Sequence, residues 1–214
     1  MRLGKSLIGN PVFDITDGRK LGEVKDLYVD DDLTAVVGLF LGREGLLRPT
    51  PHFVERADIA LFGIEVILAK AGATVYEGAE ATEPPGWLRL EALRGREVKT
   101  PGGTRIGKVG DVALDEEARI TGFSLTNLAV KGPVAEAAAV ARKAVVEVAS
   151  TDNIMTLDLA QAEQAPLAVD PDLLFSKAIE TPLEAPYEAP AEEIEIPQES
   201  APLDQEEAER SESA

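Results

Sequence analysis

Cysteine is absent from the 214 residues of this chain. Disulfide bonds and thiolate zinc sites are therefore excluded, and the absence is typical of proteins in a reducing compartment. Aromatic residues are scarce, with six Phe, three Tyr and one Trp. The core must therefore consist mainly of Val, Leu, Ile and Ala, and few rings are available on which nucleic-acid bases could stack.

Basic residues are also few. Lys and Arg number 21 against 39 Asp and Glu, and the formal net charge is −18. Proteins that bind nucleic acid need clustered Lys and Arg to displace counterions, and the sequence has no such cluster. Direct binding of nucleic acid is therefore not expected. Much of the negative charge lies in residues 161–214, where 15 acidic residues stand against Lys177 and Arg210.

Long apolar runs are missing. The longest apolar stretch, residues 57–71, is interrupted by Asp58, Glu65 and Lys70, and is shorter than the roughly 20 residues of a membrane-spanning helix. The first residues show no apolar run of signal-peptide length. We therefore expect a cytoplasmic protein without a transmembrane segment, which contacts a membrane only through a partner.

The sequence offers no clear catalytic motif. His52 is the only histidine, and nothing in the sequence assigns it a nucleophile or an orienting carboxylate, so a structural role is favoured. Residues 102–108 fit the first seven positions of a phosphate-binding loop. However, Val109 lacks the required hydroxyl, and the segment predicts a turn before a strand. We predict no catalytic or cofactor-binding residue, no cofactor and no enzyme activity.

Two acidic triplets, residues 30–32 and 115–117, invite a calcium interpretation. Neither has the alternating spacing and distal glutamate of a calcium loop, so solvated turns are the better interpretation and no metal site is predicted. Asp26 and Asp111 occupy equivalent positions in the repeat described next. We expect them to accept hydrogen bonds from turn backbone and not to act as a catalytic pair.

An internal repeat organises the chain. Residues 7–12 align with 93–98, and residues 21–26 align with 106–111, at offsets of 86 and 85. Each unit predicts several short strands separated by glycine-containing or acidic turns, as in a small barrel. The expected fold is mainly all-β, with two small β-barrels in tandem. The expected boundaries are 1–80 for the first domain, 81–92 for a linker, 93–160 for the second domain and 161–214 for an acidic, disordered tail.

The repeated pattern resembles the PRC-barrel family. It reads Leu-x-Gly-x-x-Val, then Asp-Gly-x-x-Leu-Gly-x-Val-x-Asp, then an acidic turn. The residues that carry it in the first unit are Leu7, Gly9, Val12, Asp17, Gly18, Leu21, Gly22, Val24, Asp26 and Asp30; in the second they are Leu93, Gly95, Val98, Gly103, Ile106, Gly107, Val109, Asp111 and Asp115. The family includes the barrels of the photosynthetic reaction-centre H subunit and of a ribosome-maturation factor. The resemblance implies a protein-binding module without an active site common to the family.

One loop has no counterpart in the second unit. Leu46, Leu47, Arg48 and Phe53 are predicted as a partner-docking loop, since apolar anchors and arginine are favoured in interfaces. The alternative is that Leu46 and Leu47 pack onto the neighbouring barrel. Within the tail, Leu173-Leu174-Phe175 and Ile194-Glu195-Ile196 form apolar islands that either order on a partner or are simply tolerated.

Three hypotheses for function follow. The first is a non-enzymatic adaptor or scaffold that binds a protein partner, associated with a membrane complex through that partner. The alternative is a ribosome-biogenesis factor whose acidic surface binds a basic ribosomal protein. The third is an enzyme that uses His52.

Overall fold

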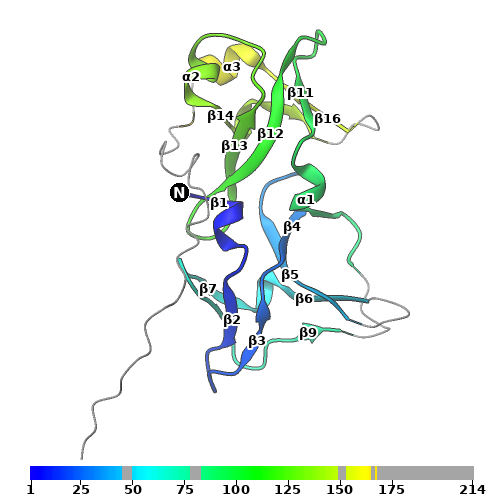
Figure 1. Cartoon of the computed structure of the whole chain (residues 1–214), viewed down its shortest axis with the longest axis vertical. Helices are drawn as coiled ribbons and strands as arrows, with labels where there is room; N and C mark the ends of the chain where they lie inside the picture. Colours follow the sequence, from blue (N-terminus) through cyan, green and yellow to red (C-terminus); the bar gives the residue numbers. More distant parts are fainter. Residues whose placement is uncertain (45–49, 78–82, 149–152, 165–166, 168–214) are drawn as a thin grey trace, which may run out of the picture. The chain divides into compact units, whose positions relative to one another are not determined.

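Strands are the predominant element of the protein (Figure 1). The computed structural model describes residues 1–44, 50–77, 83–148, 153–164 and 167. The strands are β1 (Arg2–Leu3), β2 (Pro11–Asp14), β3 (Lys20–Glu23), β4 (Asp26–Asp30), β5 (Val36–Glu44), β6 (Thr50–Glu55), β7 (Ile59–Phe62), β8 (Ile67–Ala69), β9 (Val75–Tyr76), β10 (Trp87–Arg89), β11 (Glu97–Lys99), β12 (Arg105–Leu114), β13 (Ile120–Thr126), β14 (Ala139–Ala141), β15 (Val145–Glu147) and β16 (Ile154–Leu157). The mainly all-β prediction is confirmed.

The helices are short. In the described part of the chain, the 3₁₀ helices are η1 (Gly4–Leu7), η2 (Arg56–Asp58) and η3 (Arg142–Ala144), and the α-helices are α1 (Leu90–Leu93), α2 (Pro133–Ala137) and α3 (Leu159–Gln164). Contacts between Cα atoms group the described residues into one compact unit. We call residues 1–77 the first half and residues 83–164 the second half.

The strand pairing of the first half recurs in the second. β2 lies antiparallel to β3 and parallel to β8, and β8 lies antiparallel to β7. In the same way, β11 lies antiparallel to β12 and parallel to β16, and β16 lies antiparallel to β15. β4, β5 and β6 form a meander, as do the end of β12 with β13 and β14. The internal repeat read from the sequence is therefore visible in the topology.

A short segment near the start of each half pairs with the other half. We call these two segments the leading segments: residues 2–7, which form β1 and η1, and residues 87–93, which form β10 and α1. β1 pairs antiparallel with β12 of the second half, at residues 113–114. β10 pairs antiparallel with β4 of the first half, at residues 28–30. The stretch expected to be a linker, 81–92, thus contains a strand and most of a helix, because Trp87, Leu88 and Leu90 pack against the folded core.

Two buried aspartates hold the leading segments. The Glu91 N–H donates to Asp26 Oδ2 at 3.2 Å, and the Lys5 N–H donates to Asp111 Oδ2 at 2.8 Å. Both aspartates are only 3% exposed, and Asp26 also accepts from Nε of Arg89 at 2.7 Å. These carboxylates accept backbone hydrogen bonds, as expected, but the amides of Lys5 and Glu91 belong to short helices of the opposite half and not to turns. Asp111 also accepts the N–H of Val112 in its own half.

Two arginines at equivalent positions complete the connection. Arg56 of η2 donates to the carbonyl of Glu117, and Arg142 of η3 donates to the carbonyls of Asp32 and Leu33. These carbonyls lie in the acidic turns, so the turn of each half is bonded to the 3₁₀ helix of the other. The turns are thus structural elements of the joint between the halves.

One hydrophobic cluster runs through both halves. It includes fully buried Leu7 and Val12 of the first half and Leu90, Leu93 and Val98 of the second. A second cluster, made of Tyr28, Phe40 and Phe53 with Trp87 packed against it, covers the outer face of β4–β6. Burial of this apolar surface is the main favourable contribution to stability.

The expected boundary between the second domain and the tail, at residues 160–161, falls inside a helix. α3 begins at Leu159 and ends at Gln164, so it crosses from the expected second domain into the stretch expected to be tail. Ala162 of this helix is fully buried in the main cluster, which explains why the helix packs on the second half. Residues 165–166 and 168–214 of the expected tail lie outside the described residues.

Candidate functional site

A cavity of about 530 Å³ opens beside the first leading segment. Its walls come from three places in the sequence: the first residues, the end of β7 with the residues that follow it, and the acidic turn after β12. The lining residues are Met1, Arg2, Ser6, Leu61, Phe62, Ile64, Asp115 and Glu116. The volume lies within the range of about 300–1,000 Å³ that is typical of ligand pockets. The first leading segment, which pairs with β12, supplies Arg2 and Ser6 to this lining.

The walls of the cavity expose large hydrophobic side chains. Ile64 is 87% exposed, Leu61 53% and Met1 47%. Phe62 also lines the cavity and is nearly buried. β7 is an edge strand, and within the described residues it pairs with β8 alone, so its other edge has no sheet neighbour there. Exposed hydrophobic clusters of this kind mark interaction sites.

Arg2 joins the two sides of the cavity. Its guanidinium donates to the carbonyls of Phe62 and Gly63, both at 2.8 Å, and lies 6.0 Å from the centre of the Phe62 ring. Burial lowers the pKa of Arg2, and the carboxylates of Glu116 and Asp115 act in the opposite direction. Arg2 therefore fixes the end of β7 to the strand pair β1–β12.

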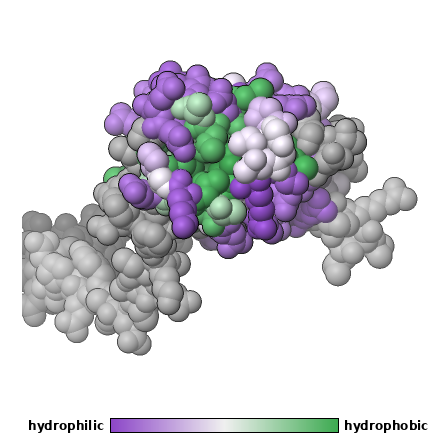
Figure 2. Space-filling model, turned by 90° about the horizontal axis from the view of Figure 1, so that it is seen from above, coloured by the Kyte–Doolittle hydropathy of each residue, from purple (hydrophilic) through white to green (hydrophobic). Residues whose placement is uncertain are grey.

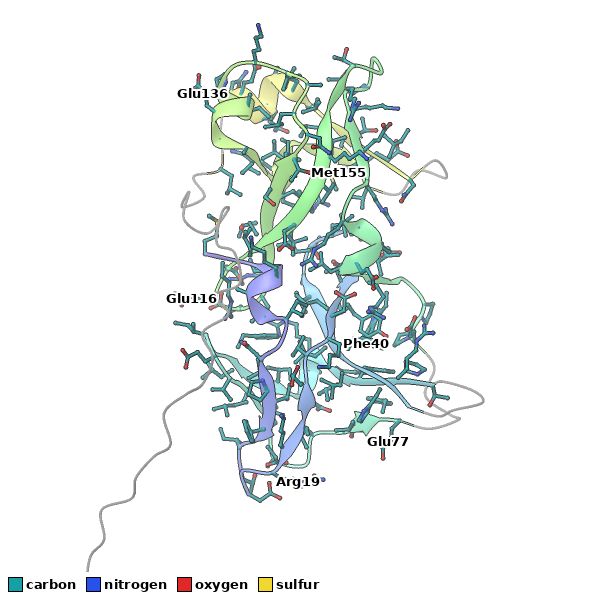
Figure 3. All side chains as sticks on the ribbon, in the orientation of Figure 1. Arg19, Phe40, Glu77, Glu116, Glu136 and Met155 are labelled. Carbon is teal, nitrogen blue, oxygen red and sulfur yellow. The ribbon has the colours of Figure 1, made fainter. Side chains whose placement is uncertain are left out.

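The acidic rim has one structural and one exposed member. Oδ1 of Asp115 accepts the N–H groups of Glu117 and Arg119, and its Oδ2 accepts from Nε of Arg119 at 2.7 Å. Burial acts to raise the pKa of Asp115, but these hydrogen bonds outweigh it and lower the pKa. Glu116 is exposed on the rim, on the side of the molecule away from Phe40 in Figure 3.

The predicted docking loop is located only in part. Leu46, Leu47 and Arg48 lie outside the described residues, so the loop stays a prediction for them. Phe53 is 1% exposed and stacks on Tyr76, with ring centres 4.9 Å apart. Its ring belongs to the aromatic cluster and is not available to a partner, which corrects its assignment as a docking side chain.

The other candidate residues have structural surroundings. Nε2 of His52 lies 3.2 Å from Oε2 of Glu77, and its side chain is 17% exposed. Within the described ranges, no three His, Cys, Asp or Glu residues gather closely enough to hold a metal ion. None of the helices in the described part of the chain combines the length and apolar character needed to cross a bilayer.

A second hydrophobic area lies at the end of the molecule that carries α2 and α3. Figure 2 looks down on this end and shows hydrophobic residues bordered by hydrophilic ones. Leu128, Val130 and Leu159, which flank α2 and begin α3, are partly buried against the core. The strongly exposed Leu61 and Ile64 lie at the cavity instead, so the cavity is the better candidate site.

Sequence reasoning did not identify the cavity residues. The apolar character of residues 57–71 excludes a membrane span by length but does not show which of their side chains are exposed. An exposed Ile64 and a buried Ile67 look alike in sequence, and only the register of β8 against β2 and β7 separates them.

Comparison with known proteins adds one finding on family and one absence. Residues 1–67 match the family model of the PRC-barrel domain. The chain therefore contains this domain in its first half, and the matched stretch includes Leu61, Phe62 and Ile64 of the cavity. A second copy of the domain stays a prediction, as does similarity to the ribosome-maturation factor. No curated protein gives a significant match to the chain.

Proposed function

We propose that the PRC-barrel domain of residues 1–67 and the half that follows it form a non-enzymatic protein-binding adaptor, with the cavity beside β1 as its docking site. The observation that carries the proposal is the exposure of Leu61 and Ile64 at the mouth of an apolar cavity. A bulky apolar side chain of a partner fits such a pocket, and contacts of this kind dominate binding energy at interfaces.

The position of the buried carboxylates supports a role without catalysis. Asp26 and Asp111 are both bonded to backbone amides, and each also contacts a guanidinium, that of Arg89 or Arg94. Both carboxylates are only 3% exposed, whereas a general acid or base must reach the proton that it transfers. Their position suits a scaffold that holds two halves together.

Affinity capture with matched variants tests the proposal. The full chain is immobilised as the unaltered protein, as the double variant Leu61→Ser/Ile64→Ser, and as Ile15→Ser. Ile15 is the control because it is 56% exposed and does not line the cavity. We expect a protein that the unaltered chain and Ile15→Ser retain, and that the double variant loses by at least about tenfold in affinity.

Two outcomes would contradict the proposal. Equal retention by all three proteins would show that the cavity is not the docking site. Retention of ribosomal proteins that depends on overall charge and not on Leu61 or Ile64 would favour the ribosome-biogenesis alternative. Far-UV circular dichroism of each variant establishes that the fold is intact.

A further inference from the structure

The arginines around the cavity already have partners within the protein. Arg2 donates to two backbone carbonyls of the opposite wall, and Arg56, whose guanidinium lies over a ring that lines the cavity, donates to the carbonyl of Glu117. Arg119 donates to the carboxylates of Asp115 and Glu117, at 2.7 and 2.8 Å. These hydrogen bonds hold the three guanidiniums against the protein's own surface.

Two carboxylates at the cavity have no such partner. Glu116 lines the cavity and is exposed, and Glu65 is exposed directly after Ile64. Within the part of the chain that the structure describes, neither carboxylate accepts a hydrogen bond or forms an ion pair, since the ion pairs of the acidic turn involve Asp115 and Glu117. The charge that the mouth of the cavity offers to a partner is therefore negative.

Arg2 also determines how a partner approaches. A strand that adds to the edge of a sheet is held by main-chain hydrogen bonds to that edge. The end of β7 has little to offer such a strand, because the carbonyls of Phe62 and Gly63 already accept from Arg2, both at 2.8 Å. The side chains of Leu61 and Ile64 are exposed there instead. The site therefore favours insertion of a side chain over addition of a strand.

We propose that this docking site selects a segment of a partner protein in which a large apolar side chain is adjacent to a lysine or arginine. The apolar side chain enters the cavity against Leu61 and Ile64, and the cation pairs with Glu116. The methylene groups of a Lys or Arg side chain also pack on apolar surface, so both residues of the segment contribute contact area. This selectivity rests on the proposed function, since it concerns the partner's chemistry at the same site.

Apolar burial supplies most of the affinity, and the ion pair supplies the selectivity. An ion pair at a solvated rim is weak, because water and salt screen it. Replacing the partner's cation by a carboxylate exchanges this weak attraction for a repulsion of similar size. We therefore expect a preference of about fivefold for the basic over the acidic form of the segment, which decreases at high salt.

Selection from a displayed library of random peptides provides the probe. The library is passed over the immobilised full chain and over Leu61→Ser/Ile64→Ser, and the peptides that only the unaltered chain enriches are kept. We expect their sequences to share a large apolar residue next to Lys or Arg. One such peptide is then labelled with a fluorophore, together with a form in which Glu replaces each basic residue, and fluorescence anisotropy measures both affinities.

Charge reversal on the protein identifies the pairing residue. Glu116→Lys should weaken binding of the basic peptide by about fivefold or more and make the acidic form the tighter ligand. Glu136→Lys is the matched control, because it changes the net charge equally, is exposed on α2 and is well separated from Glu116 in Figure 3. It should change either affinity by less than about twofold, since distant exposed charges are screened.

The remaining outcomes distinguish the selectivity from the docking site itself. If the enriched peptides need Leu61 and Ile64 but carry no basic residue, or if Glu116→Lys and Glu136→Lys have equal effects, the selectivity is wrong and the proposed function stands. If no peptide is enriched over Leu61→Ser/Ile64→Ser, both are contradicted. A dimer in analytical ultracentrifugation that this double variant dissociates would show that a second copy of the chain occupies the cavity, which also overturns the selectivity.

Discussion

Nε of Arg89 lies 2.7 Å from Oδ2 of Asp26, although the two residues are 63 positions apart in the sequence. The side chain of Asp26 is 4% exposed and that of Arg89 21%, so the pair is largely shielded from water. Arg89 also lies over the Phe40 ring, 3.7 Å from its centre. This pair ties the second leading segment to the first half, and its energetic weight can be measured.

Removal of the Asp26 carboxylate should destabilise the whole fold. Asp26→Ala leaves Arg89 and the Glu91 N–H without their shared acceptor, and breaking a buried ion pair from one side costs about 3–5 kcal/mol. We expect a loss at the lower end of that range in the free energy of unfolding, measured by chemical denaturation. Glu91→Gln is the control, because its side chain is 81% exposed and should change stability by less than about 0.5 kcal/mol. A loss below about 1 kcal/mol in Asp26→Ala would contradict the assigned role.

Gly38 should not tolerate even a methyl group. A Cβ there would lie 2.5 Å from Cζ3 of Trp87 and 3.2 Å from the carbonyl oxygen of Val54. Gly38→Ala should therefore displace the indole and cost about 1–3 kcal/mol. Trp87 is the only tryptophan, so its fluorescence should shift to the red as the ring becomes exposed. Gly102→Ala is the matched control, since the nearest atom to its Cβ is 3.8 Å away. An unshifted emission in Gly38→Ala would show that the cluster has room to adapt.

Alkaline pH should weaken the fold through Tyr28. Burial, and then the 2.6 Å hydrogen bond to Glu83, raise the pKa of its phenol above the ordinary value of 10.0. The unfolded chain therefore loses this proton first as pH rises. The contribution of the Tyr28 phenol to the free energy of unfolding is fully present below about pH 10. Above that pH it declines by at most about 1.4 kcal/mol per pH unit.

Tyr28→Phe isolates this contribution. Urea unfolding between about pH 8 and 11 should show a shallower loss of stability in the variant than in the unaltered protein. Tyr76, whose pKa is raised first by the charge of Glu55, accounts for part of the slope that remains. Identical slopes in the two proteins would mean that the Tyr28 phenol has the same pKa folded and unfolded.

The two halves should unfold together. The leading segments and the arginine contacts of η2 and η3 cross between the halves, so neither half keeps its full set of hydrogen bonds alone. Trp87 fluorescence and far-UV circular dichroism should therefore give one coincident transition. Arg142→Ala should lower the free energy of unfolding by about 1–2 kcal/mol without splitting the transition. Two separated transitions would contradict this prediction.

The sequence predicted the repeat because the repeat depends on local geometry. Gly9 and Gly95 have φ angles of 91° and 80°, a conformation in which glycine is favoured, and they therefore recur at the offset of 86. The acidic turns were predicted for the same reason, since Asp30 and Asp115 accept hydrogen bonds from the amides that follow them. Features that a few neighbouring residues determine are readable from sequence.

Features set by distant partners were not readable. Residues 81–92 were interpreted as a linker because Pro84 and Pro85 interrupt regular structure, yet the strand that follows depends on β4, almost 60 residues earlier. The assignment of Phe53 to a docking loop was wrong, because Phe53 is buried by ring contacts with Tyr28 and Trp87, which are distant in the sequence. The cavity escaped prediction because its walls come from distant parts of the sequence, which the pairing of β1 with β12 brings together.

The exchange of leading segments also means that covalent continuity between the halves is dispensable once folding is complete. A chain cut between Glu77 and Glu83 would consist of two pieces, each with a strand embedded in a sheet of the other. Such pieces should remain associated as a complementing pair and migrate together in native gel filtration, and they should separate only under denaturing conditions. The two halves therefore behave as a pair of interlocked fragments, in which each piece completes the other.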